Sequence, residues 1–210
     1  TCRVDLPPGP EQMWEEAARR LWVLHRRYGQ GGDKPWRRIR NGDDRRENAE
    51  VVRMMMGAGE QGHAQAQWHL GAIYYHGQSV PQSHALAVGW YRKAADQGHA
   101  QAQCGLGRMY REGKGGLPQS DALAVEWFRK AADQGCAQAQ SNLGVMYAQG
   151  QGVPPSGVLA VEWYREAADQ GHAKAQFNLG IMYEHGRVGL PQSDALAVEW
   201  YRKAADQGYA

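Results

Sequence analysis

Histidine and cysteine are the side chains of this sequence best suited to bind a metal ion or to supply a nucleophile. His63, His99 and His172 lie 36 and 73 residues apart along the chain, too far to share one ion. His69 and His76 are seven residues apart, with no third ligand nearby in the sequence. Because a zinc site needs three or four converging ligands, we expect neither a metal ion nor a cofactor.

The three cysteines, Cys2, Cys104 and Cys136, form no regular pairing pattern. Three is an odd number, and Cys104 and Cys136 occupy different positions of the repeats described below. Domains that depend on disulfides carry cysteines in even numbers at recurring spacings. We therefore expect reduced thiols, as in a cytosolic or nuclear compartment.

A basic stretch near the N-terminus could contact phosphate groups. Residues 19–46 hold ten Lys or Arg residues against three Asp residues, with Trp36 among them, whereas residues 61–210 are neutral. Such a stretch suits nucleic acid or an acidic membrane surface, although charge runs more often mark a solvated loop. The candidate basic patch consists of Lys34, Arg37, Arg38, Arg40, Arg45 and Arg46.

The bulk composition is that of a soluble protein. The 210 residues are 42% hydrophobic and 22% charged, with a mean hydropathy of −0.69 and a net charge of +2. No run approaches the roughly 18 apolar residues of a membrane span. The sequence lacks an initial Met and stops inside a repeat, which indicates a fragment of a longer chain.

The elements that must position these side chains are repeats. The stretch W-Y-R-K-A-A-D-Q-G-H-A-Q-A-Q begins at Trp90 and returns from Trp127, Trp163 and Trp200, at steps of 37, 36 and 37 residues. Self-similarity at such a period is the signature of a stacked-repeat protein.

Each repeat has the pattern of a helical hairpin. In the first clear copy, a helix from His63 to Tyr75 is ended by Gly77, and Pro81 interrupts the chain. Ser83 is a suitable cap for a second helix that runs to Gln97.

These signals divide the chain into units. A degenerate repeat at 11–61 has helices at 11–28 and 47–61, joined by a long basic loop at 29–46. The divisions are a lead-in at 1–10, this degenerate repeat, four repeats at 62–97, 98–134, 135–170 and 171–207, and the start of a truncated repeat at 208–210.

Comparison of the copies separates packing positions from free ones. Leu70, Gly71 and their equivalents do not change, which indicates the packed face of the first helix. A glycine in mid-helix costs about 1 kcal/mol, so Gly71 needs a steric reason, and close approach of the second helix through its small Ala87, Ala94 and Ala95 would supply one. The recurring Trp90 and its equivalents are expected to be core.

The positions that differ between copies lie on the opposite face of the first helix. In an array of helical hairpins that face lines the concave wall, where a partner binds. The predicted groove residues are Gln65, Trp68, Ala72, Tyr75, His76, Gln101, Cys104, Arg108, Arg111, Glu112, Ser141, Val145, Ala148, Gln149, Lys174, Phe177, Ile181, Glu184 and His185.

The pattern A-x-x-Q-x-x-L-G-x-x-Y-x-x-G, then V-P-Q-S, then A-L-A-V-x-W-Y-R-K-A-A-D-Q-G-H-A resembles the Sel-1-like repeat, a relative of the tetratricopeptide repeat. The match covers residues 62–208 closely and 11–61 weakly. The resemblance implies an all-α solenoid, a right-handed superhelix of antiparallel helix pairs. It also implies a scaffold or adaptor for other proteins, in the cytoplasm or, alternatively, in a membrane-associated or endoplasmic-reticulum complex.

Three functions follow for comparison. The first is a scaffold that binds a protein or peptide on the concave face, and the second is nucleic-acid or acidic-surface binding by the basic segment. The third is an enzyme, since some secreted bacterial proteins with such repeats are β-lactam binding or hydrolysing and look like disulfide-paired repeats. This sequence has no repeated cysteine pairing and no Ser-x-x-Lys motif, so we expect a scaffold and not an enzyme.

Overall fold

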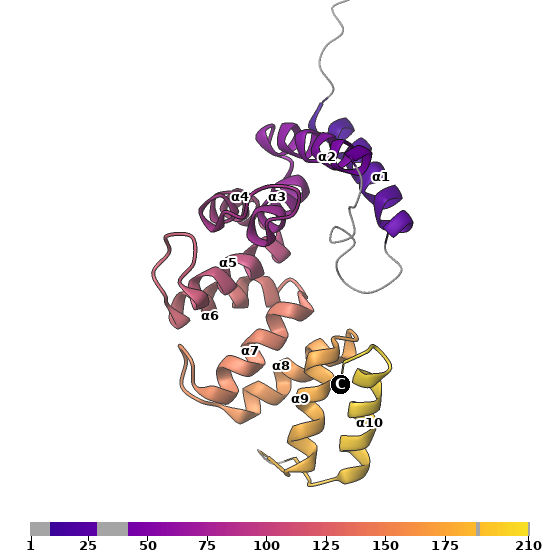
Figure 1. Ribbon diagram of the computed structural model, residues 1–210. Coiled ribbons are helices and arrows are strands. Elements are labelled where there is room, and N and C mark those ends of the chain that lie inside the picture. The colour runs from indigo at the N-terminus through magenta and orange to yellow at the C-terminus, as the bar shows by residue number, and fades with distance from the viewer. Residues whose placement is uncertain (1–8, 29–41, 188–189, 210) are drawn as a thin grey trace, which may run out of the picture. The chain divides into compact units, whose positions relative to one another are not determined.

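The computed structural model describes residues 9–28, 42–187 and 190–209, and all regular structure in these ranges is helical (Figure 1). The helices are α1 (Pro10–Tyr28), α2 (Gly42–Glu60), α3 (Ala64–His76), α4 (His84–Asp96), α5 (Ala100–Glu112), α6 (Asp121–Ala132), α7 (Ala137–Gln149), α8 (Gly157–Asp169), α9 (Ala173–Glu184) and α10 (Asp194–Ala205).

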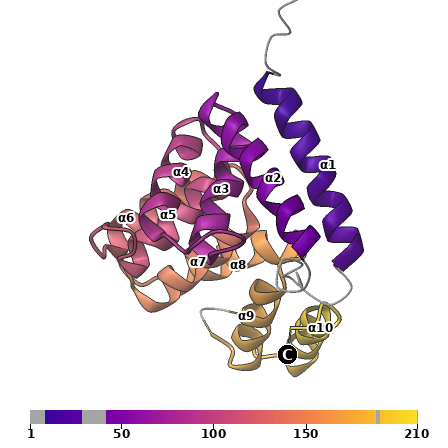
Figure 2. The same cartoon turned by 45° about the horizontal axis from the view of Figure 1, so that its top comes forward.

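The chain forms two compact units, residues 1–102 and 103–210, each with the same packing rule. Within the first unit each of the helices α1 to α4 packs on the next one along the chain. The same holds for α6 to α10 in the second unit, and Figure 2 shows α9 and α10 side by side. Packing of consecutive helices is typical of a solenoid, so the predicted all-α, solenoid-type fold is confirmed.

Local sequence signals set the helix ends. The Ser83 Oγ accepts a hydrogen bond from the Leu86 amide (3.3 Å) and caps α4, as predicted. At the start of α3 the His63 Nδ1 accepts from the Ala66 amide (3.2 Å). Gly77 ends that helix in the left-handed region, with φ of 66°, where a residue without Cβ is favoured.

One helix begins earlier than the sequence predicted. We expected the second helix of the degenerate repeat to start at Glu47, but α2 starts at Gly42. The remainder of the predicted basic loop, residues 29–41, lies outside the described residues.

The reason for the helical glycines differs from the prediction. Ala87, Ala94 and Ala95 are buried, but the group that approaches Gly71 is the ring of Tyr91. A Cβ on Gly71 would lie 2.5 Å from the Tyr91 Cε1. Gly107, Gly144 and Gly180 meet the equivalent rings of Phe128, Tyr164 and Tyr201. The glycine therefore makes room for an aromatic ring, and the small alanines are not the cause.

The recurring tryptophan is less buried than predicted. Trp90 is half-buried, and the Lys93 Nζ lies 4.3 Å from the centroid of its ring. Lys130 and Lys203 stand over Trp127 and Trp200 in the same way. The lysine stem and charge cover the part of the ring that helix packing leaves exposed.

A glutamine ladder links successive hairpins. The buried Gln67 donates to the Gly59 carbonyl (2.8 Å) and accepts from the Gln97 Nε2 (2.7 Å). The same glutamine pair recurs as Gln134 with Gln103, Gln170 with Gln140 and Gln207 with Gln176. These bonds satisfy polar groups that the stacking of hairpins removes from water.

Replacement of Gln67 by leucine is expected to lower the free energy of unfolding by about 1 kcal/mol, because it removes the buried hydrogen bond from Gln67 to the Gly59 carbonyl, which keeps the Gly62 amide as a donor. Urea unfolding of the two proteins measures the difference. Gln97 is exposed, so its replacement by alanine should cost clearly less. Equal losses for the two variants would contradict the assignment of Gln67 as the buried member of the ladder.

Candidate partner-binding site

The structure distributes the predicted groove residues over the first helices of the repeats, α3, α5, α7 and α9. Two of them are corrections, because Cys104 is only 7% exposed and Ser141 only 1%. Both occupy the repeat position of Trp68. In the first copy that position is covered by the residue that precedes the next first helix, since the Trp68 ring stacks on His99. Side chains at this position are thus partly or wholly covered by the next repeat.

Three of the predicted residues line a pocket in the first unit. The pocket has a volume of about 180 Å³ and lies against α2 and α3. Its lining residues are Met55, Trp68, His69, Ala72, Ile73, His76 and Gln78. Trp68, Ala72 and His76 come from the predicted groove, and the structure therefore brings them together.

Stacked rings hold the tryptophan of the pocket in place. The Trp68 ring lies 4.3 Å from the His69 ring, edge to face, and 5.5 Å from the His99 ring. Trp14, from α1, stacks in turn on His63 and His69, with ring centroids 5.2 Å away in both cases. Because a partner need not immobilise a side chain that is already fixed, this arrangement favours binding.

The pocket is electrically neutral where His69 lines it. Burial lowers the pKa of His69 to about 4, and the charge of His99 nearby acts in the same direction. The ring is therefore uncharged at neutral pH, and its Nε2 lies 3.3 Å from the Gln65 Nε2. A neutral ring beside Met55 and Ile73 suits an apolar guest and disfavours a charged one.

Sequence reasoning missed part of this wall. The sequence suggested His69 only as a possible metal ligand, and no role was predicted for Met55 or Ile73. A signal was present for His69, because its equivalents are Gly105, Asn142 and Asn178 and the position varies between copies. Met55 is different, because only the packing of α2 on α3 shows that it borders the pocket.

Aromatic packing also holds Phe177, a predicted groove residue of the second unit, in place. The Phe177 ring lies 5.3 Å from the Tyr201 ring and 5.6 Å from the Tyr209 ring. The Tyr201 hydroxyl donates to the Glu184 Oε2 at 2.7 Å. Phe177 and Glu184 are both predicted groove residues, and each is held by a contact with Tyr201.

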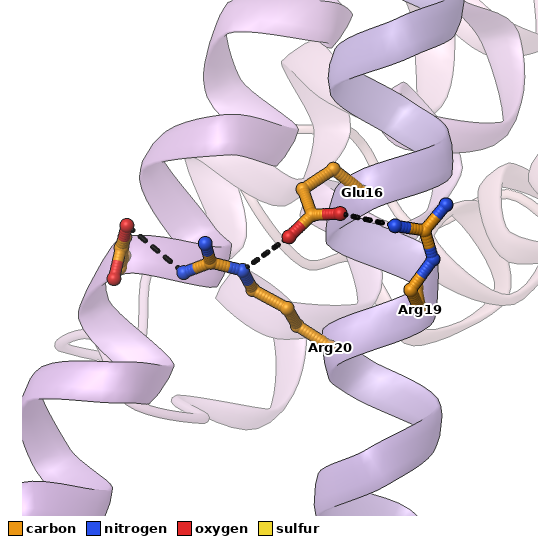
Figure 3. Close-up of polar contacts among 4 residues, drawn as sticks. Glu16, Arg19 and Arg20 are labelled. Carbon is orange, nitrogen blue, oxygen red and sulfur yellow. Dashed lines mark hydrogen bonds and ion pairs between the residues drawn. The ribbon is translucent and has the colours of Figure 1, made fainter.

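The basic segment is only partly described. Lys34, Arg37, Arg38 and Arg40 lie outside the described residues, whereas Arg45 and Arg46 belong to α2. Figure 3 shows Arg19 and Arg20 directed at Glu16, with N–O distances of 2.9 and 2.6 Å. Arg20 also pairs with Glu50 at 2.9 Å. These pairs neutralise part of the positive charge, and nucleic-acid binding stays a prediction.

Two kinds of feature, a membrane-spanning helix and a metal-binding cluster, are absent from the described residues. No helix in these ranges has the length and apolar character needed to cross a membrane. Within the same ranges, no three His, Cys, Asp or Glu side chains are grouped in a way that could hold a metal ion.

Comparison with known proteins gives a consistent result. The model of the Sel1 repeat family matches residues 64–99, 100–136, 137–172 and 173–209. No curated protein matches the chain significantly.

Several solved structures are similar to the chain. A protective antigen present in uropathogenic Escherichia coli strains, which displays an SLR fold, is 38% identical with a TM-score of 0.70. The match covers 96% of this chain and 42% of the antigen, so the chain spans less than half the antigen's length.

Two further structures are similar over nearly the whole chain. A Sel1 repeat protein from Oxalobacter formigenes is 29% identical, with a TM-score of 0.75 and coverage of 95% of this chain and 74% of that protein. An immunity protein from Pseudomonas aeruginosa is 25% identical, with a TM-score of 0.60 and coverage of 97% and 69%.

Proposed function

The chain belongs to the Sel1 repeat family, and from this premise we propose that it is a scaffold that anchors an apolar side chain of a partner protein or peptide in the pocket beside Trp68. Sel1 repeats are generally non-enzymatic scaffolds for protein–protein interaction. The proposal adds to that general role a place on this chain and a chemical class of contact.

The pocket of about 180 Å³ carries the proposal. An apolar cavity of roughly 150 Å³ is large enough to hold benzene, so this one has room for an aromatic or leucine side chain. Repeat packing does not dictate every residue of its lining, because Ala72 is replaced by Arg108, Val145 and Ile181 in the later copies. Residues that packing leaves free and that surround a hollow are suited to recognition.

The chemistry of the wall selects the anchor. Trp68 offers an aromatic face, Met55 and Ile73 offer apolar contacts, and the neutral His69 adds no charge. A charged group from the partner would lose its hydration on entering beside the apolar side chains of Met55 and Ile73. We therefore expect Phe, Trp, Leu or Met at the anchor position of the partner, with polar residues around it.

Replacement of Ala72 by arginine tests the proposal. Arginine already stands at the equivalent position 108, so the helix accepts it, but at position 72 it would fill the pocket and bring a charge. Peptides selected for binding from a random displayed library are expected to bind this variant at least tenfold more weakly than the original chain, which corresponds to about 1.4 kcal/mol. Fluorescence anisotropy of the selected peptides measures the affinity.

The matched control is Ala85→Arg. Ala85 is exposed on α4 and does not line the pocket. The control variant should bind the selected peptides within about twofold of the original chain, as expected for a surface substitution away from the contact. Undiminished binding by the Ala72 variant would refute the pocket as the anchor site, even if the chain still bound the peptides elsewhere.

A further inference from the structure

Where the first helices of two successive repeats come together, two positions of the repeat, one from each copy, are in contact. The residue that precedes a first helix contacts the residue at the Trp68 position of the copy before it. His99 stacks on Trp68 with ring centroids 5.5 Å apart, and Tyr209 meets Phe177 at 5.6 Å. These partners are 31 and 32 residues apart in the sequence. The register of the array therefore places this pair of side chains together.

At the junction of α5 and α7 both members of the pair are cysteines. Cys104 has the position of Trp68, and Cys136 precedes α7, 32 residues later. Cys104 lies in the hydrophobic core of the second unit, and Cys136 packs against the same cluster. Both are free thiols, and their side chains lie close enough together for the Cys104 thiol to donate to the Cys136 sulfur. Because the two cysteines differ in repeat position, their spacing shows no pairing pattern, but those two positions meet across the junction.

The surroundings shift the pKa values of the two thiols in opposite directions. The hydrogen bond from the Cys104 thiol is the main cause that lowers the pKa of Cys136 to about 6. Cys136 makes no regular cap bond, yet the amides of Ala139 and Gln138 at the start of α7 lie close enough to lower its pKa further.

Cys104 shows the opposite behaviour. Its hydrogen bond to Cys136, together with burial, raises its pKa well above the ordinary value, while Arg108 and Asn142 act against that rise. The Asn142 Nδ2 lies 3.9 Å from the Cys104 Sγ. The pair thus loses its first proton from the half-buried Cys136, and the buried Cys104 keeps its own.

We propose that Cys104 and Cys136 form a dithiol that a hydroperoxide oxidises to an intramolecular disulfide. The Cys136 thiolate attacks the terminal peroxide oxygen, the O–O bond breaks, and the alkoxide takes a proton and leaves as alcohol or, from hydrogen peroxide, as water. Cys136 is then a sulfenic acid. The Cys104 sulfur attacks the Cys136 sulfur, the S–O bond breaks, and hydroxide leaves as water with the Cys104 proton.

The electrons balance over these two reaction steps. Two thiols lose two electrons and two protons, and one hydroperoxide gains them. The division of roles follows the structure, because the attacking thiol is the more accessible one with thiolate character, and the resolving thiol waits beside it. The product would tie α5 to α7, the first helices of two successive repeats, and close a loop of 32 residues.

Peptide mapping after oxidation tests the proposal directly. The chain with Cys2→Ser is treated with a small excess of hydrogen peroxide, alkylated and digested with trypsin without reduction. The peptides 94–108 and 131–165, which carry the two cysteines, should be recovered linked to each other and lighter by two hydrogens. The melting temperature of the oxidised monomer should rise by roughly 5 °C, because the cross-link restricts the unfolded chain. Dithiothreitol should reverse both changes.

Two further measurements separate the proposed roles. The rate of alkylation of Cys136 should rise with pH with a midpoint of about 6, and Cys104→Ala should shift that midpoint upward because it removes the hydrogen bond. In the same variant, dimedone should trap Cys136 as a sulfenic acid. Recovery of unlinked peptides that carry added oxygen, or of links only between different molecules, would overturn the proposal. An unchanged midpoint in Cys104→Ala would overturn the assigned roles.

Discussion

Alanine in place of Gly71 is expected to lower the free energy of unfolding by about 2–3 kcal/mol. The added Cβ would stand 2.5 Å from the Tyr91 Cε1 and 2.9 Å from its Cγ. Tyr91 is only 2% exposed, so its ring can move only by displacing its neighbours in the core. Alanine favours the helix by about 1 kcal/mol over glycine, so the steric cost must exceed that gain.

The neighbouring helix offers a matched control. Gly89 lies in α4, and a Cβ there would have no heavy atom within 4 Å. Gly89→Ala should therefore raise the free energy of unfolding by about 0.5–1 kcal/mol, since only the helical preference acts. Urea unfolding of both variants at one pH measures the contrast. Effects of the same sign would show that the ring of Tyr91 is not the cause.

A double variant locates the strain. Tyr91→Leu removes the ring that the Gly71 Cβ would meet, at a cost of its own in lost packing. If the clash is with this ring, Gly71→Ala should cost much less in the Tyr91→Leu background than in the original chain. The difference between the two costs is the coupling energy of the pair. Additive effects would contradict a direct contact.

Much of the fold was predictable because the repeats within this one chain can be compared with one another. The Sel-1-like pattern, the period and the cap at Ser83 rest on local chemistry that recurs in each copy, and the structure and the family match confirm them. Gly71 was correctly singled out as a position that requires a steric reason. The sequence could not say which group supplies that reason, because the alanines are constant between copies and Tyr91 changes only to another aromatic residue, Phe128.

The features that the sequence did not reveal depend on contacts between copies of the repeat. Cys104 and Cys136 occupy different repeat positions, and only the register of one hairpin on the next places them together. The same register covers Ser141, which a helical wheel placed on a free face. A wheel describes one helix, whereas exposure in a stacked array depends on the neighbouring repeat as well.

Acid is expected to destabilise the first unit through His69. Burial lowers the pKa of this ring to about 4, from an ordinary value near 6.5. Above pH 6.5 the ring is neutral in both the folded and the unfolded chain, and its contribution does not change. Between pH 6.5 and 4 the unfolded chain binds a proton that the folded chain does not, so the free energy of unfolding falls as the pH falls.

The size of this loss follows from the shift in pKa. It amounts to about 2 kcal/mol at pH 5 and approaches about 3 kcal/mol below pH 4. His99 and His172 add to it in the same direction, because burial lowers the pKa of each. Urea unfolding between pH 7 and 5 measures the total for the chain.

Asparagine at position 69 isolates the contribution of this one ring. The equivalent positions of later copies carry Asn142 and Asn178, so the helix accepts the substitution. The variant loses ring contacts with Trp14 and Trp68 and should be less stable at pH 7. Its further loss between pH 7 and 5 should nevertheless be smaller than that of the original chain by about 2 kcal/mol, because asparagine binds no proton. If the free energy of unfolding fell with pH in parallel for the two proteins, His69 would not titrate as a buried group. The assignment of an uncharged His69 to the pocket wall would then be wrong.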